Sequence, residues 1–473
     1  MEETFQVQAV LNLHFNQIDT KRDGTARFSR TGVPIFKAWT LYIPEKVDID
    51  GVLEGNPPNF AYHRDCFVYI LHLISAIRIN EEEEENGYTR ISSVLLQKKV
   101  KDYKSYLEYL IECGIIETDN HYITGEKCIG YRFTNDYVSE LKPVEITKQT
   151  LIKSIVYNVP HNFEKICEDS FMRIWFDDLE VDLEGAKGAL RELFNAEKEL
   201  IGESPAWRNY NARLLPILKL SQGDILFFVD NTSNRLHTNL TQVKSELRKF
   251  IKFKGEKLCA IDISNSQPYM ALALLNEESY NRNDMDDKIN NPSIENKSDI
   301  INLIKELENN EDVVLFKNLV TQGKFYEHFA KEMIIKGLIP NVQQTDAETL
   351  KSVRNKAKDV MFTVLFSSNR TKNDEAKLFK EKFPNVHEIF KLIKRGDKTY
   401  NTLAICLQKL ESELVLEKAC VRINSENPNV PIFTLHDSII TTEEHVEYVE
   451  AVLKEILTNN IGEVPNLKLE RWE

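Results

Sequence analysis

The chain has 473 residues, of which 42% are hydrophobic and 28% charged, so it is long enough for about two to four globular domains. This composition excludes a disordered chain and a small disulfide-bonded scaffold. No segment approaches the roughly 20 apolar residues of a membrane span, and the opening residues 1–5 lack the basic and then apolar order of a signal peptide. We therefore expect a cytoplasmic protein without a membrane partner.

The charge of the chain is acidic overall but unevenly distributed. Lys and Arg number 60 against 74 Asp and Glu, a formal net charge of −14, which counts against wrapping of nucleic acid by the whole chain. Residues 244–257, however, hold six basic and two acidic residues, among them Lys244 and Arg248. A local basic groove is therefore compatible with the composition. The seven cysteines form no CxxC pair, which is typical of reduced thiols and not of a zinc site.

The first region, residues 1–140, predicts a small α+β domain. Helices are expected at 66–79 and 92–99, and apolar residues at helical spacing over 103–111 predict a third helix that ends at Gly114. Short strands joined by turns follow over 115–133. This order is similar to a winged helix, and a domain that only packs against the rest of the chain is the alternative.

Two further regions follow. Residues 141–225 carry helical apolar spacing and predict a helical support region. Residues 226–473 alternate strands with helices, interrupted by a polar run at 276–297 that is typical of an insertion. The last region holds the residues with recognisable chemistry.

Two aspartates in this region lie near predicted strand ends. Asp262 closes the apolar run 258–263, and Asp437 follows His436 at a tight turn between two strands predicted over 431–442. Two carboxylates on neighbouring strands repel each other unless cations lie between them, and two Mg²⁺ ions about 4 Å apart serve phosphoryl and nucleotidyl transfer. For either aspartate alone, a turn-capping role is the alternative.

A predicted helix between these strands carries Arg354, Lys358, Phe362 and Phe366 at every fourth position. This spacing places them on one ridge, cationic in its first half and aromatic in its second. Such a ridge can hold triphosphate oxygens and stack under a base. An ordinary amphipathic helix, with its phenylalanines in the core, is the alternative.

Five segments, read in order, resemble the motifs of family-A DNA polymerases and the related phage-type single-subunit RNA polymerases. They cover about half of the chain. Asn234-Arg235-Leu236-His237-Thr238 resembles T-G-R-L-S-S, with Asn in place of Gly, and residues 262–267 resemble motif A, D-Y-S-Q-I-E. The ridge and Ser367 match the spacing of motif B, R-x3-K-x3-F-x3-Y-G, and residues 379–386 resemble the Y-F-x-x-Y-P-G-V that follows it. Residues 408–413 resemble Q-G-T-A-A-D, and 435–438 resemble motif C, V-H-D-E.

The resemblance implies a fold and a set of roles. The fold would be α+β, a right-hand polymerase palm and fingers at 226–473 with fingers at about 299–400, a thumb-like region at 141–225 and a winged-helix-like domain at 1–140. Asp262, Asp437 and the backbone carbonyl of Ile263 would hold two Mg²⁺ ions, with Mn²⁺ as an alternative. The nucleotide would be bound by Arg354, Lys358, Phe362, Phe366 and Gln267. The primer-template would be contacted by Arg235, His436, Gln408, Lys244 and Arg248.

Departures from the motifs bear on the sugar of the substrate. Gln267 stands where the DNA polymerases carry a glutamate that blocks a ribose 2′-hydroxyl and the RNA polymerases a glycine, and glutamine is as bulky as glutamate. Phe366 stands where a tyrosine hydroxyl helps the RNA polymerases recognise ribose, and phenylalanine has no donor. Both substitutions favour dNTPs, whereas Ser438 is the choice of the RNA polymerases.

We therefore expect a template-directed DNA polymerase that binds primer-template DNA and dNTPs. The N-terminal half shows no D-x-E on an apolar strand, so no proofreading exonuclease is expected, and the small size suggests a mobile element, phage, plasmid or defence system. Three alternatives stay open: an RNA polymerase or primase that uses RNA or NTPs, a template-independent transferase, and a catalytically silent replication initiator that binds DNA. The sequence identifies no protein partner.

Overall fold

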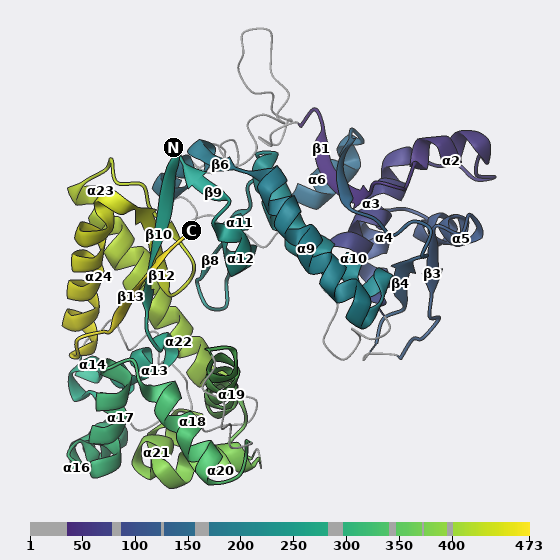
Figure 1. The fold of residues 1–473 in the computed structure, drawn as a ribbon. Coiled ribbons are helices and arrows are strands. Elements are labelled where there is room, and N and C mark those ends of the chain that lie inside the picture. The colour runs from purple at the N-terminus through teal and green to yellow at the C-terminus, as the bar shows by residue number, and fades with distance from the viewer. Residues whose placement is uncertain are drawn as a thin grey trace. The chain divides into compact units, whose positions relative to one another are not determined.

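The computed structural model describes residues 36–77, 87–123, 127–156, 170–281, 297–339, 347–370, 373–394 and 401–473 (Figure 1). The chain divides into two compact units. Unit 1 contains residues 1–228, 237–255 and 473, and unit 2 contains residues 229–236 and 256–472. The first two sequence-predicted regions, 1–140 and 141–225, thus belong to the same unit. No helix among the described residues is both long and apolar enough to cross a membrane.

The N-terminal part of unit 1 is a mixture of helices and antiparallel strands. Its helices are α2 (Ile49–Gly55), α3 (Arg64–Ala76), α4 (Ser93–Lys99) and α5 (Tyr103–Glu112). Strands β2 (Thr89–Arg90), β3 (Ile116–Thr118) and β4 (Gly130–Phe133) form a sheet in the order β2-β4-β3, and β1 (Trp39–Pro44) pairs with β5 (Leu141–Ile146). The boundary predicted at residue 140 therefore lies directly before a strand that pairs with β1.

The three helices expected over 66–111 are present as α3, α4 and α5, with residues 78 and 79 of the first expected helix outside the described residues, and β3 and β4 lie within the expected strand range 115–133. Gly114 has a φ of +69°, the left-handed conformation expected of a residue that ends a helix. The strand expected around residue 122 is reduced to an isolated bridge between Ile123 and Lys127. The core of this part is mainly aliphatic and contains an aromatic cluster, in which the Phe67 and Tyr106 ring centroids are 4.6 Å apart. Its likeness to a winged helix stays a prediction.

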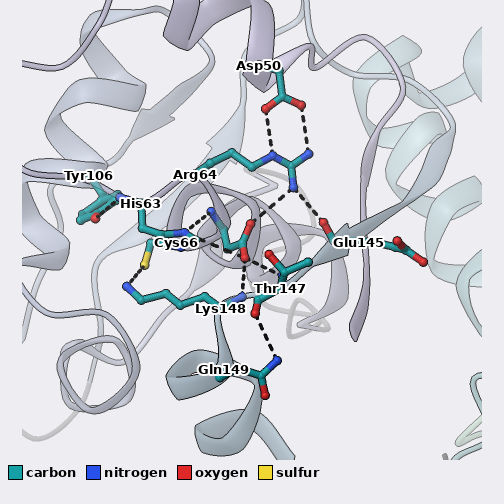
Figure 2. A network of polar contacts seen from close by, with 10 residues as sticks. Asp50, His63, Arg64, Cys66, Tyr106, Glu145, Thr147, Lys148 and Gln149 are labelled. Carbon is teal, nitrogen blue, oxygen red and sulfur yellow. Dashed lines mark hydrogen bonds and ion pairs between the residues drawn. The ribbon is translucent and has the colours of Figure 1, made fainter. Parts of the chain in front are cut away.

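A buried aspartate connects α3 to the chain after β5, and Figure 2 labels its neighbours Arg64, Thr147 and Lys148. The side chain of Asp65 is 3% exposed and accepts hydrogen bonds from the backbone N–H groups of Thr147 and Lys148, both at 2.7 Å. These groups directly precede α6 (Gln149–Val156), so the carboxylate caps the start of that helix from another element. The neighbouring Arg64 donates to Asp50 and to the carbonyl of Glu145.

The remainder of unit 1 is mainly helical. Its long helices α9 (Leu183–Ile201) and α10 (Glu203–Ser221) pack against each other and are joined at Gly202, whose φ of +88° allows the sharp reversal. The shorter elements are α8 (Ser170–Arg173), η3 (Ile174–Asp178), β6 (Leu179–Val181), α11 (Asn239–Gln242), α12 (Ser245–Arg248) and β9 (Ile251–Phe253), which pairs with β6. Strands β7 (Phe227–Val229) and β8 (Leu236–Thr238) lie at the boundary between the units and pair with each other across the loop 230–235, which belongs to unit 2.

Unit 2 contains an antiparallel sheet covered by helices. In this unit β11 (Phe433–Thr434), β12 (Ser438–Thr442), β10 (Glu256–Ile263) and β13 (Leu467–Arg471) lie in that order. Helix α24 (Val446–Ile461) contacts both β10 and β12. Helix α22 (Thr402–Ser412) continues through the π-helical segment η5 (Glu413–Cys420) into α23 (Val421–Glu426). The apolar run 258–263 is therefore a central strand, as its sequence predicts.

The second half of unit 2 is helical. After α13 (Ser266–Ala271), η4 (Leu272–Leu275) and α14 (Glu277–Asn281), the described helices are α16 (Lys297–Leu307), α17 (Glu311–Thr321), α18 (Phe325–Ile335), α19 (Ala347–Phe366), α20 (Asp374–Lys382) and α21 (Pro384–Ile393). Residues 282–296 of the predicted polar insertion lie outside the described residues. Buried phenylalanines form the core here, and the rings of Phe316 and Phe325 are 5.3 Å apart.

We expect Asp65→Ala to reduce the free energy of unfolding by about 1–2 kcal/mol, because it leaves two backbone N–H groups at the start of α6 without their acceptor. Urea unfolding followed by circular dichroism measures this loss. The control is Asp50→Ala, which breaks an ion pair whose aspartate side chain is 59% exposed and should change the unfolding free energy by less than about 1 kcal/mol. Equal effects of the two substitutions would contradict the capping role.

Candidate active site

Two paired strands bring Asp262 and Asp437 together. In the antiparallel register of β10 and β12, Asp262 lies opposite Ser438, the residue that follows Asp437. The backbone N–H of Ile263 donates to the carbonyl of Asp437 at 3.1 Å, which extends the pairing to the strand ends. Leu435 N–H donates to the carbonyl of Ser438 at 3.0 Å and closes a two-residue turn. The predicted pair of strand-end carboxylates is therefore formed by the sheet itself.

The charges around the turn affect the protonation of Asp437. Burial raises the pKa of Asp437 well above its usual range, and repulsion from Asp262 and then from Glu411 raises it further. Lys358 acts in the opposite direction and lowers the pKa of Asp437. Three carboxylates and the lysine of the predicted ridge thus interact within one site of unit 2.

The donor set suits a hard divalent cation. Within the described residues, no cluster of three or more His, Cys, Asp or Glu side chains is arranged to hold a metal ion. A metal here would instead be held by Asp262, Asp437 and the predicted third ligand, the backbone carbonyl of Ile263. All three supply oxygen, which Mg²⁺ prefers. A divalent cation between Asp262 and Asp437 would also offset the repulsion that raises the pKa of Asp437, so the residues fit the predicted metal.

Glu411 connects two other segments of the site to its own helix. Its side chain is 1% exposed, and one oxygen accepts from Arg235 Nε at 3.0 Å and from an Arg235 terminal nitrogen at 2.5 Å. The other oxygen accepts from Ser266 Oγ at 2.6 Å and from Gln267 Nε2 at 2.8 Å. Arg235 neutralises the buried charge, and the four hydrogen bonds satisfy both carboxylate oxygens. The motif segments around residues 235, 266 and 411 thus share one carboxylate.

The loop between β7 and β8 is shaped to present Arg235. The carboxylate of Asp230 accepts from the backbone N–H groups of Thr232, Ser233 and Arg235 and from the Ser233 hydroxyl, at 2.7–3.1 Å. Asn234 adopts a φ of +57°. Asparagine tolerates this left-handed conformation better than most residues, which explains how Asn234 can stand where the resembling motif has glycine.

The predicted ridge lies on helix α19. The Arg354 guanidinium lies 5.3 Å from the ring centre of Tyr326 and donates from Nε to Glu327 at 2.7 Å, and both partners lie on α18. Lys358 Nζ lies 5.7 Å from the Phe362 ring centre, and the Phe362 and Phe366 ring centres are 5.6 Å apart. The four residues therefore lie on one helix, where Lys358, Phe362 and Phe366 lie close to one another in succession and Arg354 contacts α18.

The end of this helix is held by a buried lysine. Lys394 is 8% exposed, and its Nζ donates to the carbonyls of Val364 at 2.7 Å and Ser367 at 3.0 Å. Burial lowers the pKa of Lys394 to about 8. Carbonyls at a helix C-terminus lack partners within the helix, so Lys394 completes the last turn beside Phe366.

Three residues of this site were not predicted from the sequence. Glu411 lies in the segment 408–413, in which only Gln408 was assigned a role. Its position between Leu407 and Leu414, on the apolar side of a helix, was the one sequence feature that pointed to a buried carboxylate. Tyr326 and Glu327 carried no signal. Burial raises the pKa of Tyr326, Asp437 and Glu327 raise it further and Arg354 lowers it, so α18 interacts electrostatically with the aspartate site.

The other residues predicted to contact primer-template are divided between the two units. His436 occupies the turn beside Asp437 with a φ of +62°, and Gln408 lies on α22, one turn before Glu411. Lys244 precedes α12 and Arg248 ends it, both within unit 1. Their predicted contact with primer-template stays a prediction.

Comparisons with known proteins give limited information. No family model matches the sequence, and no curated protein matches it. Among solved structures, 88 chains match. One is the POL domain of Pol1 from M. smegmatis in complex with DNA primer-template and dNTP, at a TM-score of 0.41 and 10% identity, covering 69% of this chain and 76% of that one. A likeness of this degree does not define a fold, and the site stands on its own geometry.

We expect Asp437→Asn to raise the melting temperature in metal-free neutral buffer by about 2–4 °C, roughly 1 kcal/mol in a unit of this size. The folded pKa of Asp437 lies above the unfolded value, so the ionised carboxylate destabilises the fold above that pKa and protonation removes the penalty as pH falls. The gain should therefore shrink in acidic buffer. Differential scanning calorimetry over pH measures it, with Asp359→Asn on the exposed side of α19 as control. A lower melting temperature for Asp437→Asn at neutral pH would contradict the repulsion.

Proposed function

We propose that the chain is a magnesium-dependent nucleotidyltransferase that extends a 3′-hydroxyl with dNTPs on a template, a DNA polymerase of family-A type without a proofreading exonuclease. The observation that carries the proposal is the meeting of Asp262 and Asp437 on paired strands, with Lys358 close enough to lower the pKa of Asp437. Paired carboxylates and a cation are the groups that bind metal and triphosphate in such transfers. The order of the resembling motifs along the chain supports the same function.

The residues of the site would bind either the metal or the triphosphate, according to their charge. Asp262, Asp437 and the carbonyl of Ile263 would hold Mg²⁺, which when bound neutralises phosphate charge and makes the 3′-hydroxyl a better nucleophile. Lys358 would stabilise the negative charge that develops on the triphosphate. Arg354 would add a bidentate contact, and its ion pair with Glu327 is 40% and 47% exposed, which is weak enough to yield to phosphate.

The aromatic half of the ridge would receive the base and sugar. Phe362 and Phe366 present two rings in an edge-to-face arrangement next to Lys358. Such rings stack on bases without regard to sequence, as a templated enzyme requires. Phe366 offers no hydroxyl for ribose and Gln267 retains the bulk that would exclude a 2′-hydroxyl, so dNTPs are the proposed substrates.

Primer-extension assays with Mg²⁺ test the function directly. The wild type should incorporate dNTPs as directed by the template, and Asp437→Asn should reduce incorporation by at least about 10³-fold, because a metal ligand is lost. NTP incorporation would favour the RNA polymerase or primase alternative, and untemplated extension a terminal transferase. Absence of incorporation under all these conditions, with intact DNA binding, would favour the silent initiator.

Lys358→Met should reduce kcat/KM for dNTP by about 10²–10³-fold, because the positive charge that would stabilise the triphosphate is lost. Lys356→Met is the matched control. Lys356 is an exposed lysine on the same helix, and positions two residues apart on a helix do not share a face. Equal losses in both variants would show that general positive charge, and not the ridge, acts on the substrate.

A further inference from the structure

Glu411 and Gln267 form a contact with a defined direction, and the role inferred for it rests on the proposed function. Arg235 donates twice to one oxygen of Glu411, so this carboxyl group is ionised and acts only as an acceptor. The amide of Gln267 must then turn its nitrogen toward Glu411, in agreement with the 2.8 Å contact from Nε2. The amide carbonyl oxygen points away from the carboxylate.

That contact is the polar restraint on the side chain. Gln267 is 8% exposed, and its Oε1 is buried without a hydrogen-bond partner among the described residues. The amide is therefore held from one side, by Glu411. Once this single polar anchor is lost, packing alone would restrain the three side-chain torsions of Gln267, and other rotamers would become accessible.

The anchor is a feature of this chain. Residues 408–413 resemble Q-G-T-A-A-D, and the position of Glu411 corresponds to an alanine in that pattern. Alanine has no acceptor to offer to Gln267 or to Arg235. This chain therefore has glutamate at 411, where the motif has alanine, and glutamine at 267, where the motif has glutamate. A glutamate at both positions would place two like charges side by side, and these would repel each other.

We propose that Glu411 is the positioning residue for sugar selection. It holds Gln267 in the orientation in which the side chain occupies the space of a ribose 2′-hydroxyl. Selectivity for dNTPs over NTPs then depends on the restraint of Gln267 as well as on its size. Ser266 donates to the same carboxylate oxygen through its own hydroxyl, so removal of that hydroxyl offers a matched control.

Two substitutions separate restraint from size. Gln267→Met keeps the length of the side chain and removes the amide that Glu411 holds. Glu411→Met keeps the length at the other position and removes the acceptor. Each should lower the ratio of kcat/KM for dNTP to that for the matching NTP by about tenfold or more, measured by single-nucleotide insertion on a primed template.

Further variants show whether Glu411 acts through Gln267. Glu411→Gln should retain most of the selectivity. The new amide oxygen can accept from Arg235, and the new amide nitrogen can donate to the Gln267 oxygen once the Gln267 amide rotates by half a turn. The double variant Gln267→Met/Glu411→Met should be no less selective than either single variant. Ser266→Ala should leave the ratio within about twofold of wild type. Thermal unfolding of each protein confirms that it is folded, and Gln267→Met keeps the test decisive if Glu411→Met does not fold.

The outcomes distinguish this inference from the proposed function. If the wild type incorporates dNTPs selectively and Gln267→Met keeps the wild-type ratio, size alone selects the sugar and the role of Glu411 is wrong. Additive losses in the double variant, or a loss in Ser266→Ala equal to that in Glu411→Met, would also overturn it. If the wild type neither incorporates dNTPs nor is stabilised by them in a thermal shift assay with Mg²⁺, the proposed function fails and the inference fails with it.

Discussion

The concentration of negative charge in unit 2 is the constraint on which its site depends. Asp262, Asp437 and Glu411 interact strongly enough that the pKa of Asp437 is raised by both of the others. The protein compensates Glu411 internally, through Arg235 and two neutral donors. For Asp437, a backbone hydrogen bond and the positive charge of Lys358 act against this repulsion. Glu411 thus has charged and neutral donors within the protein, and the proposed metal would add positive charge at the two aspartates.

Three left-handed residues give the backbone its shape at this site. Asn234, Asn265 and His436 have φ values of +57°, +55° and +62°, and each lies directly before a residue of the site: Arg235, Ser266 and Asp437. Non-glycine residues adopt this conformation at a cost, and they do so chiefly where the surrounding structure holds them. The two asparagines are among the residues best suited to it, whereas histidine at the turn between β11 and β12 is less common. Left-handed backbone thus coincides with residues of the candidate site.

Much of the local structure could be predicted from the sequence. Three local features appear as expected, because each depends on residues that are neighbours in the chain. They are the strand that contains Asp262, the turn at His436 and the helix that carries a residue of the ridge at every fourth position from Arg354 to Phe366. Glu411 could not be assigned a role in this way. Its partners lie 144 to 176 residues away, and an isolated glutamate in an apolar helix gives no indication of what neutralises it. The contact of Arg354 with Tyr326 and Glu327 could not be predicted either, because it depends on how α18 packs against α19.

The sequence by itself determined the elements and the identity of the charged residues at their ends, since periodicity and turn chemistry act over a few residues. Only the tertiary structure decided which charges meet. The register of β10 and β12 places Asp262 beside Asp437, and the packing of α13 and α22 places Gln267 on Glu411. Strand register and helix packing arise from the burial of the whole apolar surface, so no single segment contains them.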